Sequence, residues 1–147
     1  MEFKGKKDYV ANYLMDLTKE QAARYNTDKI EKIEELGDGS YIAYMTTKSS
    51  LTLGSRDFCY VVSKFPLKNG DIAVVKHTID HKDRPKGKNI RGIIDEMILV
   101  QPTSDVNVRV ISVLNMDMKG SVPSSKMTKI VDKHMEEFAT YKTAMDK

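Results

Sequence analysis

Apolar residues recur at steps of three and four between residues 7 and 29, which is the spacing of one face of a helix. No glycine or proline interrupts this stretch, and Asp8 lies where a first-turn carboxylate favours a helix. The polar run Asn26-Thr27-Asp28 indicates its end. The pattern therefore predicts one helix over residues 7–29.

The middle of the chain changes to short apolar runs separated by glycine, proline and polar residues, which is typical of antiparallel strands. Gly37-Asp38-Gly39 indicates a hairpin turn, so the residues on both sides of it should be strands. The long run that ends at Pro102 is expected to bend at Gly92. The predicted strands are Lys32–Leu36, Tyr41–Thr47, Arg56–Phe65, Ile72–His81, Asn89–Pro102 and Val108–Met118.

A second helical pattern runs from Ser124 to about Met145. Charged residues crowd most of its faces, and Ser124 or Ser125 is expected to cap its start. Its apolar stripe consists of Met127, Ile130, Val131, Met135, Phe138 and Met145. Such a stripe needs a surface to cover, and the strands provide one. The sequence thus indicates a single α+β domain over residues 1–147.

Composition narrows the classes of function. The hydrophobic fraction is 40% and the net charge is only +3, so nothing argues for a nucleic-acid partner. The charge permits weak, transient contact with an anionic membrane surface. No run approaches the ~20 apolar residues of a membrane span. The nine methionines indicate either ordinary core packing or an interior that adapts to a variable guest.

The single cysteine, Cys59, excludes an internal disulfide and favours a reducing, cytoplasmic setting. The charged N-terminal residues are not followed by an apolar run, so no signal peptide is predicted.

No motif for catalysis or metal binding stands out. His77 and His81 would share one strand face but lie ~13 Å apart, which is too far for one metal ion. Asp95 and Glu96 would face opposite sides of a strand, and Cys59 lacks a nucleophile signature. We therefore expect no metal, no cofactor and no enzymatic activity.

Five short segments occur in an order and spacing that resemble the START family, the lipid-transfer domains related to steroidogenic acute regulatory protein. They are Arg24-Tyr25-Asn26, Ser55-Arg56-Asp57-Phe58-Cys59-Tyr60, Asp80-His81-Lys82-Asp83-Arg84-Pro85, Ile90-Arg91-Gly92 and Asp117-Met118-Lys119-Gly120-Ser121-Val122-Pro123. The resemblance implies a helix-grip fold, in which a curved antiparallel sheet wraps around a long C-terminal helix. It also implies that one phospholipid, sterol or related lipid lies between them.

Two departures from the family pattern affect these expectations. The usual N-terminal helix and first strands are missing, which leaves the predicted strand Val108–Met118 as an open edge. We expect the N-terminal segment, or a second copy in a homodimer, to cover that edge. Some sterol carriers bury an acidic and a basic residue where this chain has Met45 and Val62, so sterol specificity does not transfer.

The resemblance also places Arg56 inward, either as an anchor for a phosphate or carboxylate or in a structural ion pair. Lys76 is expected to face water, which turns its strand neighbours inward because side chains alternate. The predicted ligand-binding residues are Met45, Arg56, Phe58, Tyr60, Val62, Val75, His77, Ser112, Leu114, Met127, Ile130, Val131, His134 and Phe138.

Two loops each allow a functional and a purely structural interpretation. Leu51 and Leu53 belong either to a lid beside the last helix or to the core. The basic loop with Lys82, Arg84, Lys86 and Lys88 is either solvated or contacts lipid headgroups.

The sequence thus predicts a cytoplasmic lipid-binding or lipid-transfer protein. One alternative is a protein-interaction or co-chaperone-like helix-grip module with a collapsed cavity. A small-molecule enzyme of the helix-grip superfamily is another.

Overall fold

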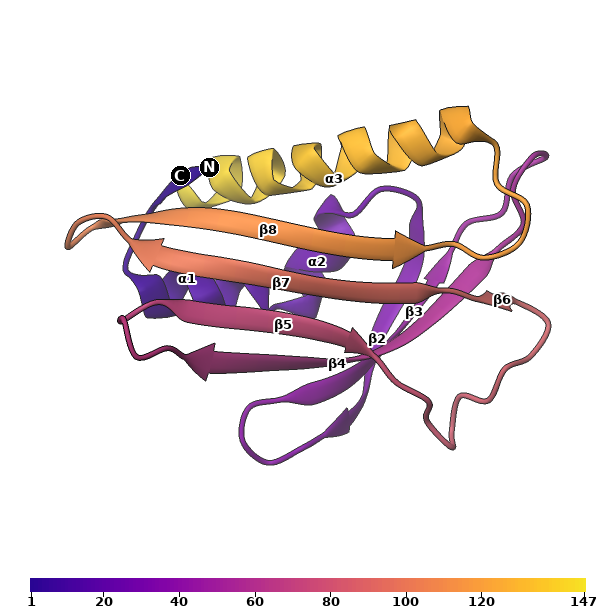
Figure 1. Ribbon diagram of the computed structural model, residues 1–147, viewed down its shortest axis with the longest axis horizontal. Coiled ribbons are helices and arrows are strands. Elements are labelled where there is room, and N and C mark those ends of the chain that lie inside the picture. Colours follow the sequence, from indigo (N-terminus) through magenta and orange to yellow (C-terminus); the bar gives the residue numbers. More distant parts are fainter.

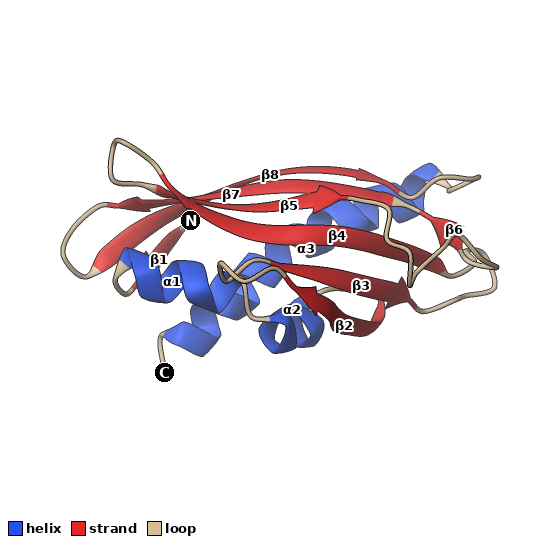
Figure 2. Ribbon diagram, turned by 90° about the horizontal axis from the view of Figure 1, so that it is seen from below, coloured by secondary structure: helices blue, strands red, loops and turns tan.

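One curved antiparallel sheet carries three helices on a single face. The computed structural model describes residues 1–147. Figure 1 shows α3 running along the length of the sheet, and Figure 2 shows all three helices on the same side of it. The strands are β1 (Glu2–Lys4), β2 (Thr27–Glu35), β3 (Tyr41–Thr47), β4 (Arg56–Pro66), β5 (Ile72–Thr78), β6 (Ile90–Arg91), β7 (Ile93–Pro102) and β8 (Asn107–Asp117), and the helices are α1 (Lys7–Leu14), α2 (Leu17–Ala23) and α3 (Ser124–Met145).

The strand order is β1-β8-β7-β5-β4-β3-β2, and the short β6 pairs in parallel with the start of β4. Most connections are therefore hairpins between neighbouring strands, as the meander pattern predicts. The exception is β1, which lies beside β8 although the two are far apart in the sequence.

The predicted single helix over residues 7–29 is wrong, because the chain forms two shorter helices and then a strand. The side chain of Asp16 accepts a hydrogen bond from the backbone N–H of Thr18 at 2.8 Å and so caps α2. Asn26 adopts φ 60°, which turns the chain into β2 at Thr27. Both residues are polar types that favour caps and turns over a helix interior.

The strand predictions are largely confirmed. β3 has its predicted bounds, and the hairpin at Gly37-Asp38-Gly39 joins β2 to β3. The predicted run Asn89–Pro102 breaks at Gly92 into β6 and β7. β5 ends at Thr78, before the predicted end at His81.

The N-terminal segment covers part of the β8 edge. Phe3 lies opposite Val108, and Met1 and Val110 exchange two backbone hydrogen bonds of 2.8 and 2.9 Å. From Ile111 onward, no strand lies on that side of β8. Of the two covers expected for this edge, the N-terminal segment is present, and the homodimer stays a prediction.

The last helix has its predicted bounds but a different buried face. Its N-cap position is Pro123 and no side chain caps it, so the expected serine cap is wrong. Val131 is 59% exposed and Met135 is 64% exposed, so neither belongs to the buried stripe. Phe138 is buried as predicted, and Tyr141, which was not predicted, is buried beside it. No helix of the chain combines the length and hydropathy that a bilayer span requires.

The break between β6 and β7 generates a prediction about Gly92. A Cβ atom there would lie 2.3 Å from Cε1 of Phe58 and 3.0 Å from the carbonyl oxygen of Asp117. Because Phe58 is buried and cannot move away freely, Gly92→Ala should lower the free energy of unfolding by roughly 1–3 kcal/mol in a urea titration.

Gly87→Ala is the matched control, because a Cβ at Gly87 would meet nothing within 4 Å. Equal stability of the two variants would contradict the argument that residue 92 must lack a side chain.

Candidate functional site

A small cavity lies between the sheet and the N-terminal half of α3. Its volume is about 40 Å³. It is lined by Arg24, Tyr25, Asn26, Thr27, Met45, Thr47, Phe58, Leu114, Met116, Met118, Ile130, His134 and Glu137. One part of the wall is apolar and rich in methionine, and the other part carries buried charge.

The structure brings several predicted site residues to this cavity. Met45, Phe58, Leu114, Ile130 and His134 line it. Four others lie on the same side of the sheet but away from the cavity wall, in the packed core or beside it. These four are Tyr60, Val62, Met127 and Phe138. Ligand binding by any of these residues stays a prediction.

The predicted orientation of β5 is wrong. Lys76 is only 2% exposed and points inward, whereas His77 lies on the outer face and pairs with Asp95 at 2.8 Å. Val75 is likewise on the outer face and half-buried. The reason is the pairing of Lys76 with Glu96 on β7, since two opposite charges can share an interior position that either would avoid alone. Val75, His77 and the exposed Val131 therefore do not face the cavity.

Arg56 is 2% exposed but binds backbone carbonyl groups. Its Nε donates to Met118 O at 3.0 Å, Nη1 to Gly54 O at 2.6 Å and Nη2 to Lys119 O at 3.0 Å. The side chain thus joins the loop before β4 to the turn that leads into α3. These contacts favour a structural role for Arg56. Its partners are backbone carbonyl groups instead of the acidic side chain of the expected ion pair.

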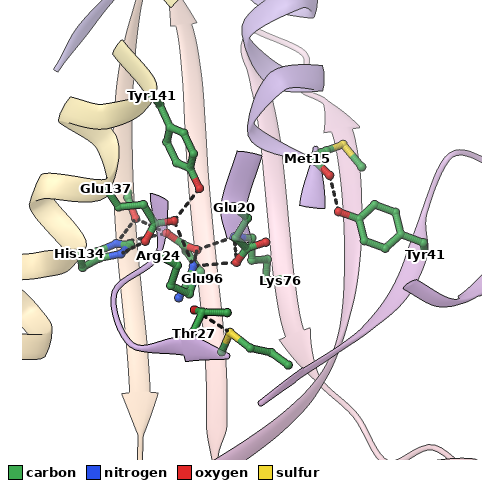
Figure 3. A network of polar contacts seen from close by, with 12 residues as sticks. Met15, Glu20, Arg24, Thr27, Tyr41, Lys76, Glu96, His134, Glu137 and Tyr141 are labelled. Carbon is green, nitrogen blue, oxygen red and sulfur yellow. Dashed lines mark hydrogen bonds and ion pairs between the residues drawn. The ribbon is translucent and has the colours of Figure 1, made fainter. Parts of the chain in front are cut away.

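A network of six charged side chains, five of them buried and His134 partly buried, occupies the centre of the helix-covered face (Figure 3). It joins α2, β5, β7 and α3, and we call it the charge network. Its ion pairs are Arg24–Glu20 at 2.9 Å, Arg24–Glu137 at 3.4 Å, Arg24–Glu96 at 3.6 Å, Lys76–Glu20 at 2.9 Å, Lys76–Glu96 at 3.3 Å, His134–Glu96 at 3.2 Å and His134–Glu137 at 3.4 Å.

The charges of the network balance when His134 is protonated. Burial by itself would lower the pKa of His134, but hydrogen bonds to Glu137 and Glu96 outweigh it and raise the pKa to about 9. Burial would likewise raise the pKa of Glu96, yet the nearby Lys76 holds that pKa well below its usual range. At neutral pH three carboxylates therefore face three cations.

This network was not predicted from the sequence, because buried charge was expected only at Arg56 and at the positions of Met45 and Val62. Signals were present in the chain: Glu20 and Arg24 are four residues apart, and His134 and Glu137 are three apart. On β7, Glu96 lies on the inner face, where the neighbouring inward residues are apolar.

Three residues of the site have the types found in hydrolase triads. Ser112 Oγ lies 3.2 Å from His134 Nε2, and His134 Nδ1 lies 3.4 Å from a carboxylate oxygen of Glu137. The serine hydroxyl, however, donates to Glu96 at 2.8 Å. Because His134 is protonated at neutral pH, it has no free lone pair with which to accept the serine proton.

Arg24 lines the cavity, and one of its side-chain N–H groups has no hydrogen-bond acceptor. All three of its ion pairs are made by Nη2, and its buried Nε–H has no hydrogen-bond partner. In Figure 3 the side chain lies between the α3 residues and Glu20, next to Thr27. This Nε–H is enclosed by protein atoms, and in the same network Glu96 Oε2 is a buried acceptor that also lacks a hydrogen-bond partner, although Glu96 does not line the cavity.

A second small space lies next to the first. It measures about 50 Å³ and is lined by Tyr25, Asn26, Ser50, Leu53, Lys126, Lys129 and Ile130. Three of these residues also line the main cavity. In the leucine loop, Leu53 is buried, which fits packing onto the core. Leu51 is fully exposed, which does not.

The basic loop is only partly free. Arg84 pairs with Glu31 at 2.6 Å and stacks over the ring of Tyr44. Lys82 and Lys86 are exposed. A contact of this loop with lipid headgroups stays a prediction.

A curved antiparallel sheet closed by a long C-terminal helix, with a space beneath that helix, defines a helix-grip protein. The START domain family model matches residues 6–145, so the chain belongs to the START domain family. The predicted family and the predicted α+β helix-grip fold are both confirmed.

Solved structures agree with this fold. Human STARD10 is 21% identical with a TM-score of 0.75, over 96% of this chain and 60% of that chain. A STAR-related lipid transfer protein from Xanthomonas axonopodis is 15% identical with a TM-score of 0.80, over 100% of this chain and 83% of that one. The Zhui aromatase/cyclase from Streptomyces sp. R1128 is 10% identical with a TM-score of 0.63, over 99% and 90%. No curated protein matches significantly.

The raised pKa of His134 predicts a pH-dependent stability. Its contribution is fully present below the ordinary histidine pKa near 6.5 and is lost as the pH rises to about 9. Urea unfolding should therefore show wild-type stability falling across that window by up to about 3 kcal/mol. His134→Gln, which cannot be protonated, should lack this fall.

His77→Gln is the control, because His77 is exposed on the outer face. It should keep the wild-type pH profile. A wild-type profile that is flat between these pH values would show that His134 is not protonated in the folded state.

Proposed function

We propose that this protein binds a single lipid in the space between the sheet and α3, and that it transfers or senses that lipid. The observation that carries the proposal is the cavity beneath α3, with a methionine-rich apolar wall in a START domain. Burial of each CH₂ group there would contribute ~0.8 kcal/mol, so one long chain supplies most of the affinity.

Binding requires the cavity to open, because ligand sites typically measure ~300–1,000 Å³. The two halves of α3 differ in how firmly they are held. Glu137, Phe138 and Tyr141 are buried in the C-terminal half, whereas Met127 and Ile130 in the N-terminal half are only half-buried. We infer that the N-terminal half moves and that the flexible lining methionines rearrange around the ligand.

The second small space supports a route for entry. It lies between the leucine loop and the start of α3, where Lys126 and Lys129 are located. Leu51 is fully exposed at the tip of that loop. An apolar tip beside lysine side chains suits transient contact with an anionic membrane surface. The buried Cys59 thiol fits a cytoplasmic setting.

Two alternatives remain distinct from lipid binding. The small cavity volume favours a protein-interaction module whose interior is closed. An enzyme is not favoured, because the histidine of the site is protonated at neutral pH and cannot act as a general base.

A cavity-filling variant tests the proposal. Leu114 lines the cavity, so Leu114→Trp should occupy the space and reduce the uptake of fluorescent phospholipid and sterol analogues by at least about tenfold. Mass spectrometry of the purified wild-type protein should also detect a co-purified lipid.

Val113→Trp is the matched control on the same strand, because Val113 is 60% exposed on the opposite face. It should bind the analogues like the wild type. If the wild type takes up no lipid of any class, the interaction module is the correct reading.

A further inference from the structure

We propose that the cavity selects lipids whose buried polar end is an uncharged hydrogen-bond acceptor, and that Arg24 is the residue that recognises it. This inference rests on the proposed lipid binding and adds the chemical class of the ligand. Hydroxyl, ketone, ester and amide groups qualify, whereas a carboxylate or phosphate at that end does not.

Arg24 has a side-chain N–H without an acceptor. Arg24 is buried, lines the cavity and makes all of its ion pairs through Nη2. Its Nε–H lacks an acceptor, which is unfavourable for a buried group. This Nε–H is enclosed while the cavity is closed, so a ligand oxygen becomes its acceptor only after the opening that lipid binding requires. The opened site would then favour an acceptor over a purely apolar end.

The charges of the network are balanced before any ligand binds. Glu20, Glu96 and Glu137 contribute three negative charges, and Arg24, Lys76 and protonated His134 contribute three positive ones. These six groups compensate one another inside the protein. An anionic ligand end would add a seventh buried charge with no partner, which is costly in a low-dielectric interior. A neutral acceptor adds none.

Arg56, the buried cation outside the charge network, does not change this charge balance. Arg56 does not line the cavity, and its guanidinium donates to the carbonyl groups of Gly54, Met118 and Lys119. Its donors are thus turned toward the protein's own backbone. Arg24 is the cation on the cavity wall with a donor to spare.

A pair of fluorescent probes with one shared chain tests this inference. Cis-parinaric acid and its methyl ester carry the same polyene, but at neutral pH the acid is charged and the ester is not. The wild type should bind the methyl ester at least about tenfold more tightly than the acid.

Removal of one carboxylate should change this preference. At about pH 6, below the ordinary histidine pKa near 6.5, His134 keeps its proton without Glu137. There Glu137→Gln leaves the network with one excess positive charge, so the acid should gain at least about tenfold relative to the ester. Glu96→Gln makes the same change of charge on β7 and serves if the first variant does not fold. Glu136→Gln is the control, because Glu136 is exposed on α3 and pairs with Lys133. It should keep the wild-type ratio.

The outcomes separate this inference from the proposed function. If the wild type binds the acid as tightly as the ester, or more tightly, the inference is overturned while lipid binding stands. A folded carboxylate-to-amide variant with an unchanged ratio would overturn it as well. If neither probe binds, the proposed function itself fails.

Discussion

The charge network is the interaction on which the rest of the structure depends. It lies where α2, β5, β7 and α3 meet, and each of these elements contributes at least one charged side chain. Removal of one member of a buried ion pair is far more damaging than replacement of the whole pair, because it leaves an uncompensated charge. The network therefore fixes the register of the strands and the position of the helix together. Apolar packing alone would specify these less narrowly.

The network also divides α3 into two parts. The turn around His134 and Glu137 is tied to α2 and β7, and the aromatic rings of Phe138 and Tyr141 pack edge to face beside it. Toward Ser124 the helix packs through the half-buried Met127 and Ile130, and Lys129 lies over the ring of Tyr25. A helix held at one end and loosely seated at the other is suited to a protein that must both enclose a guest and release it.

Much of the fold could be predicted from the sequence, because its signals are local. The hairpin glycines, the strand Tyr41–Thr47 and the bounds of α3 follow from turn residues and periodicity. The site was harder to predict because its geometry depends on partners distant in the chain. Lys76 faces inward only because Glu20 and Glu96 meet it there, and the usual preference of a lysine for water predicts the opposite orientation. Arg56 depends in the same way on carbonyl groups about sixty residues later.

The pairing of the first strand with the last has a consequence for the order of folding. Met1 bonds to Val110, and 109 residues separate them in the sequence. On a ribosome the N-terminal strand emerges first, yet its neighbour in the sheet is made only after most of the chain. Completion of this sheet edge is therefore a late, non-local step with a large loop-closure cost, of the kind that slows folding.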